Sequence, residues 1–140
     1  MKVQCTYRRG DHIPDEGIGI GYLQTTCFDQ FVVHGRNYTV FGMYIDKSVI
    51  HYLVVNPETI RPDWLPAFLF EIVDHRLPYG WAFQICDRSA FVIEAIWGYS
   101  EMVQKDGRHY VDLIEREPTA LEIFDRRRLE IEDEASDPIL

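Results

Sequence analysis

The sequence predicts an α+β fold: a largely antiparallel sheet, made of a meander and a second hairpin, carries one main amphipathic helix and C-terminal helical segments. In four runs joined by short turns, apolar residues alternate with period 2, which is typical of strands in hairpins. Between the two pairs of runs, apolar residues recur with helical spacing. This order of strands, helix, strands and helix favours a helix packed on one face of an antiparallel sheet.

The first half of the chain is expected to contribute a short strand near residues 3–7, irregular chain up to residue 27, and then the meander. Turn-forming residues at 34–37 and 46–48 separate its strands. Asn56-Pro57 ends the last strand, because proline cannot donate to the ladder. The three predicted strands are Phe28–Val33, Tyr38–Ile45 and Val49–Val55.

The main helix is predicted over the residues from Asp63 to Leu77. Asp63 is a typical N-cap, and Pro66 falls in the first turn, where its missing N–H would have no helical partner. The apolar residues form one wide stripe: Trp64, Leu65, Phe68, Leu69, Ile72, Val73 and Leu77.

The rest of the chain is predicted to form a second hairpin followed by helices. The hairpin strands are Trp81–Cys86 and Ala90–Trp97. Tyr110 and Leu113 share a helical face, and Pro118 is a typical first residue of a further helix. Residues 1–129 are expected to form a single domain, and residues 130–140, with five acidic and no basic side chains, an acidic and flexible tail.

The four strand-like runs in the middle of the chain have two different sides. One side is strongly apolar, and we expect the main helix to cover it. The other side mixes small, apolar and polar side chains, and we expect it to be open to a partner or a ligand. The candidate binding residues on this mixed face are Tyr44, His51, Gln84 and Glu94.

Three residues of the mixed face are candidates for catalysis. If the two hairpins adjoin, His51 and Glu94 approach each other, and an imidazole beside a carboxylate supplies an acid and a base. Cys86 is the third candidate, as a thiolate paired with His51, although no family signature surrounds it. The structural alternative is a sheet surface whose polar side chains reach water. Metal-ligand motifs are absent from the sequence, so no metal and no cofactor is expected.

Composition and charge restrict the function. The net charge of −9 repels nucleic-acid phosphates and anionic membranes, so neither is an expected partner. The N-terminus lacks the apolar stretch of a secretory signal, and no run approaches the about 20 apolar residues of a membrane helix. Three cysteines without a CxxC pair indicate free thiols. A cytoplasmic location is therefore expected.

The leading hypothesis is a non-catalytic protein-interaction module that binds a basic protein or a second copy of itself. One concrete form, which depends on size and charge alone, is an acidic inhibitor of the immunity or antitoxin type. The alternative is a small-molecule enzyme or ligand-binding protein, with the acid–base pair His51 and Glu94 on the mixed face. We lean against an enzyme, because no catalytic motif is present in the sequence.

Overall fold

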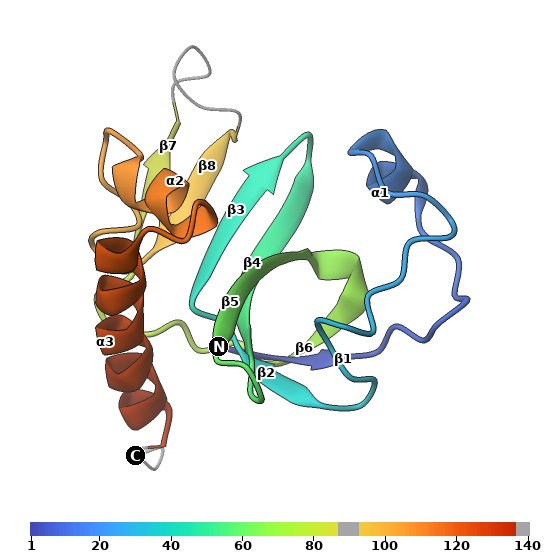
Figure 1. Ribbon diagram of the computed structural model, residues 1–140, viewed down its shortest axis with the longest axis horizontal. Helices are drawn as coiled ribbons and strands as arrows, with labels where there is room; N and C mark the ends of the chain where they lie inside the picture. The colour runs from blue at the N-terminus through green and yellow to red at the C-terminus, as the bar shows by residue number, and fades with distance from the viewer. Residues whose placement is uncertain (87–92, 137–140) are drawn as a thin grey trace.

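A computed structural model describes residues 1–86 and 93–136 (Figure 1). It confirms the α+β class, with antiparallel strands and C-terminal helices. The described strands form two sheets in place of the single sheet that we expected. The smaller sheet has the order β2-β1-β6 and the larger sheet the order β5-β4-β3-β8-β7.

All neighbouring strands in both sheets are antiparallel. The smaller sheet contains β1 (Lys2–Cys5), β2 (Asn37–Thr39) and β6 (Phe70–Asp74). The larger sheet contains β3 (Gly42–Asp46), β4 (Val49–Asn56), β5 (Arg61–Pro66), β7 (Ala82–Ile85) and β8 (Ala95–Gly98).

The hairpin of β3 and β4 is confirmed, together with its turn. Lys47 and Ser48 form a two-residue loop, and both have a positive φ, of 47° and 67°. This is the combination that a type I′ turn requires, and its twist matches that of the flanking strands. The expected run Tyr38–Ile45, in contrast, is divided between β2 and β3, with Phe41 buried at the crossing from one sheet to the other.

The helix predicted over Asp63–Leu77 is wrong. This segment forms β5, a single 3-10 turn η1 (Ala67–Leu69) and β6. Because β5 is an edge strand, Pro62 and Pro66, four residues apart, both fit with their missing N–H on the side away from β4. The residues of the expected apolar stripe do not share one buried face, since Leu65 and Leu69 are buried, whereas Ile72 and Val73 are exposed.

The strand predicted over Phe28–Val33 is also wrong, because this segment consists of turns and irregular chain. Phe28 and Val32 are buried, so their spacing reflects packing of a loop against the core. In the segment expected to be irregular, Asp15–Gly19 forms the short helix α1.

The C-terminal helices are confirmed as α2 (Arg108–Ile114) and α3 (Pro118–Ala135). The side chain of Glu117 caps α3 by accepting hydrogen bonds from the backbone N–H groups of Thr119 and Ala120. The helix continues into the segment 130–140, where Ile131 is buried. Residues 137–140 lie outside the described part of the chain.

Two apolar clusters hold these elements together. The first lies between the two sheets and the N-terminal segment, and includes Val3, Phe28 and Leu69. The second lies between the larger sheet and α2 and α3, and includes Leu53, Leu113 and Phe124. The larger sheet is therefore packed on one face by helices and on part of the other face by the smaller sheet.

Candidate functional site

The mixed face of the larger sheet is the one that the helices cover. Leu53, Cys86 and Ile96 belong to the same buried cluster as Leu113 of α2 and Phe124 of α3. The rings of Phe41 and Phe124 meet edge to face at 5.6 Å. The face that we expected to be open is therefore packed against the chain's own C-terminal segment, and the helices lie on that side of β7 and β8 (Figure 1).

Tyr44 and His51 lie opposite each other on β3 and β4, and their rings stack at 4.5 Å with an angle of 9° between the planes. Trp64 of β5 and Tyr110 of α2 pack against the Tyr44 ring at 4.9 Å and 5.6 Å. These four side chains form an aromatic cluster beneath α2. His51 is only 5% exposed, and the Nδ1 atom of its ring has no hydrogen-bond partner within the described residues.

Burial determines the charge state of the aromatic cluster. It lowers the pKa of His51, so the imidazole is neutral near pH 7. It raises the pKa of Tyr110 to about 12 and that of Tyr44 further, so both phenols keep their protons. The Tyr44 ring stacks on this neutral imidazole and meets Tyr110 edge to face, so it links the sheet to α2.

Gln84 and Cys86 lie at the other end of the mixed face. The side-chain amide of Gln84 donates to the carbonyl of Ile85 at 2.9 Å. Gln84 and Cys86 line a cavity of about 10 Å³, closed by Met102 and Tyr110, which is about the space that one water molecule needs. Burial also raises the pKa of the Cys86 thiol, and this disfavours the reactive thiolate.

Glu94 lies just before β8, and its backbone N–H donates to the carbonyl of Ile45. Strand β3 separates β8 from β4, the strand that carries His51. The backbones of His51 and Glu94 are therefore two strand spacings apart, each about 4.8 Å. The predicted approach of the two hairpins is confirmed, but it brings Tyr44 and not Glu94 opposite His51.

The strongly apolar face of the larger sheet is partly open. On β4, Tyr52 and Val54 pack against the smaller sheet in the first cluster. Toward β7 this cover ends, and Phe83 and Ile85 are 59% and 71% exposed. The Phe83 ring stacks on Trp97 of β8 at 6.1 Å. The strand register places six side chains side by side, which we call the outer apolar face: Ile45, Ile50, Phe83, Ile85, Ala95 and Trp97.

The sequence pattern placed these residues on the strongly apolar side of the strands. Their exposure was not predicted, because the helix expected over Asp63–Leu77 was assigned to cover that side. The signal that could have corrected this is the pair Pro62 and Pro66. Two prolines in one short apolar run are typical of an edge strand, and only one of them fits the start of a helix.

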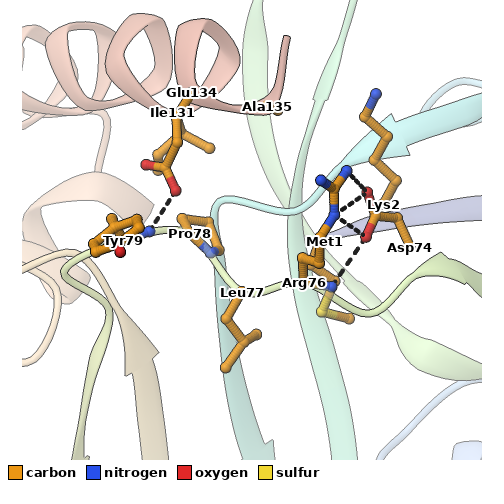
Figure 2. A pocket seen from close by; sticks show the side chains of 10 residues that line it. All are labelled: Met1, Lys2, Asp74, Arg76, Leu77, Pro78, Tyr79, Ile131, Glu134 and Ala135. Atoms are coloured by element: carbon orange, nitrogen blue, oxygen red, sulfur yellow. Dashed lines mark hydrogen bonds and ion pairs between the residues drawn. The ribbon is translucent and has the colours of Figure 1, made fainter. Parts of the chain in front are cut away.

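A cavity of about 430 Å³ lies between the end of α3, the start of β1 and the segment that precedes β7 (Figure 2). Some of the polar groups that line it are paired with each other. Arg76 makes a two-pronged ion pair with Asp74, which holds the pKa of that carboxyl far below its usual range. The backbone N–H of Tyr79 donates to Glu134 at 2.6 Å. The contact of Tyr79 with Glu134 ties α3 to the segment between β6 and β7.

Two buried histidines are expected to make the stability of the protein depend on pH. Burial lowers the pKa of both His51 and His109 below the ordinary value of 6.5. Below about pH 6.5 the unfolded chain therefore takes up protons that the folded chain does not, and the free energy of unfolding falls as the pH falls. Urea unfolding between pH 7.5 and pH 5.5 measures this slope.

His51→Phe is the variant that isolates one histidine, because it keeps a flat ring against Tyr44 and removes the titratable group. We expect a smaller loss of stability between pH 7.5 and pH 5.5 than in the native chain. An unchanged slope would show that His51 is not protonated on unfolding in this range.

Within residues 1–86 and 93–136, no group of three or more His, Cys, Asp or Glu side chains is placed to hold a metal ion. Of the helices in these residues, none has the length and hydropathy needed to cross a bilayer. Comparisons of the chain with protein-family models, with curated proteins and with solved structures find no match.

Proposed function

We propose that the chain is a non-catalytic protein-interaction module that binds a basic partner protein through its outer apolar face. The observation that carries the proposal is the exposure of Phe83 and Ile85, 59% and 71%, beside further apolar side chains on three neighbouring strands. Apolar residues that are contiguous and exposed are typical of surfaces that bind other proteins, whereas scattered ones need no explanation.

The net charge of −9 supports a basic partner, because opposite charge accelerates encounter and disfavours acidic competitors. An acidic inhibitor of the immunity or antitoxin type is one form of such a module. Its partner would be an enzyme that acts on nucleic acid and carries a cationic site. This finer assignment depends on size and charge.

The alternative function, an enzyme with His51 and Glu94 as acid and base, gains no support from the geometry. His51 is buried in the aromatic cluster, and β3 lies between its strand and β8. The cavity beside Gln84 and Cys86 has room for about one water molecule. We therefore place binding on the opposite face of the sheet.

Affinity capture tests the proposed function. The native chain and the double variant Phe83→Ser with Ile85→Ser are immobilised and exposed to a lysate of the cells that make the protein. We expect the native chain to retain a basic protein that the double variant loses, because the apolar contact area is removed. Mass spectrometry identifies the retained protein.

The matched control is Leu23→Ser, which alters a side chain that is 64% exposed but lies in the N-terminal segment, away from the outer apolar face. It should retain the same protein as the native chain. Identical captures by the native chain and the double variant, with unchanged melting temperatures, would refute binding through this face.

A further inference from the structure

The two edge strands of the larger sheet, β5 and β7, differ in the residues that they carry. Strand β5 carries Pro62 and Pro66, which lack the N–H group that pairing needs, and the charged Arg61 and Asp63. Strand β7, with the sequence AFQI, contains neither proline nor charge. In natural proteins, prolines and charged side chains on an edge strand prevent it from pairing with a strand of another chain. The edge at β5 is protected in this way and the edge at β7 is not.

The register of β7 against β8 determines which backbone groups face this edge. The N–H of Cys86 donates to the carbonyl of Glu94 at 2.8 Å, so the backbone of Cys86 faces β8. The backbone groups of successive residues in a strand face opposite sides, so those of Gln84 also face β8, whereas those of Phe83 and Ile85 do not. The N–H and C=O groups of Phe83 and Ile85 therefore point away from β8.

Phe83 and Ile85 are the same two residues whose side chains are exposed on the outer apolar face. Within the described residues, β7 pairs only with β8. One of the outward groups, the Ile85 carbonyl, accepts a hydrogen bond from the Gln84 side chain, which a competing N–H donor would displace. Two alternate residues thus offer both backbone pairing and an apolar surface.

We infer that the partner adds an extended segment to the edge of β7, with alternating apolar and basic residues. The segment bonds to the backbone of Phe83 and Ile85 and lays its apolar side chains beside the outer apolar face. In this type of recognition the main chain supplies affinity and alternate side chains supply specificity. The inference rests on the proposed function for the existence of a protein partner, and adds how that partner binds.

A second copy of the chain fits this edge less well. Taking about 200 Å² for a large side chain, the exposed parts of Phe83 and Ile85 offer roughly 250 Å² per copy, against about 800 Å² per partner in a standard interface. Each copy also brings a net charge of −9, so two copies repel each other. A basic extended segment is instead attracted by the negative charge of the chain, and it can make contacts beyond the ends of β7.

The test uses the full chain and an acetylated, amidated heptapeptide that alternates lysine and valine. Amide hydrogen exchange is measured by NMR with and without the peptide. We expect the amides of Phe83 and Ile85 to exchange fast in the protein alone and at least about tenfold slower at saturating peptide. The amide of Gln84, which already bonds to β8, is the internal control and should change little.

A pair of variants at one position separates backbone pairing from side-chain contact. Ile85→Pro removes the outward N–H without removing a bond to β8, as the prolines of β5 do on the other edge. Ile85→Ala trims the side chain and keeps the N–H. We expect the proline variant to lose the peptide's protection of Phe83, and the alanine variant to keep it with weaker affinity. The exchange pattern of the native chain remains decisive even if the proline variant does not fold.

Four results would overturn the inference. If the peptide shifts resonances of the outer apolar face without slowing exchange at Phe83 and Ile85, strand addition fails and the proposed function stands. If a peptide with glutamate in place of lysine protects them equally, the claim that the partner is basic is wrong. If protection grows with protein concentration alone, the edge binds a second copy. If the lysine–valine peptide does not bind, the inference fails, and affinity capture alone then decides the proposed function.

Discussion

Replacing Phe124 by alanine is expected to lower the free energy of unfolding by about 3–5 kcal/mol. Phe124 is 2% exposed, and its ring meets Phe41 edge to face in the cluster between α3 and the larger sheet. The substitution removes most of a large buried side chain and leaves a cavity that its neighbours fill only in part. Urea unfolding followed by circular dichroism measures the loss.

Leu129→Ala is the matched control on the same helix. Leu129 is 55% exposed, so we expect its replacement to change the free energy of unfolding by no more than about 0.5 kcal/mol. Equal effects of the two substitutions would show that α3 does not pack on the sheet. The mixed face would then be open, and His51 and Gln84 would again be candidates for a binding surface.

Local signals in the sequence predicted the elements whose structure depends on local residues. The hairpin of β3 and β4 follows from alternation on both sides of a two-residue turn, and α3 begins at Pro118 as its preference for the first helical position indicates. The α+β class follows from these elements. The prediction for the segment after Asn56 failed, because an edge strand of the larger sheet, a 3-10 turn and a strand of the smaller sheet together have the apolar spacing of one helical stripe.

Which face of the larger sheet is covered could not be predicted, because that depends on contacts between distant segments. The side chains of the mixed face are polar or small enough to suggest exposure, yet His51 stacks on Tyr44, and the Tyr44 ring packs at a tilt against Trp64. Gly42 belongs to the same arrangement, since a Cβ atom there would lie 3.1 Å from the Trp64 ring. None of these pairings has a signature in a single sequence.

The pair of Glu101 and Arg127 is expected to contribute most among the ion pairs of the C-terminal segment. Arg127 donates to both carboxylate oxygens of Glu101, at 2.7 Å and 3.0 Å, and to the hydroxyl of Ser100. Its guanidinium lies over the ring of Tyr99, whose hydroxyl is hydrogen-bonded to buried His109 at 2.6 Å. This chain of contacts joins the end of β8 to α2 and α3.

We expect Arg127→Met to lower the free energy of unfolding by about 2–3 kcal/mol, because it leaves the Glu101 carboxylate largely buried without its main partner. Adding Glu101→Gln should recover part of the loss. Arg126→Met is the control: Arg126 is 60% exposed and reaches Glu101 only at 3.5 Å, so its effect should stay below about 0.5 kcal/mol.

The arginine substitutions also carry a pH signature. Arg127 lowers the pKa of Glu101 below the ordinary value of 4.5, so the stabilisation from the pair is present above that pH and is lost as the pH falls through the lowered value. The difference in stability between the native chain and Arg127→Met should therefore shrink in acid, while the difference for Arg126→Met stays small throughout. If both variants lost equal stability at pH 7, the contacts of Arg127 would be no stronger than those of an exposed surface pair, and the link from β8 to α3 would depend on apolar packing alone.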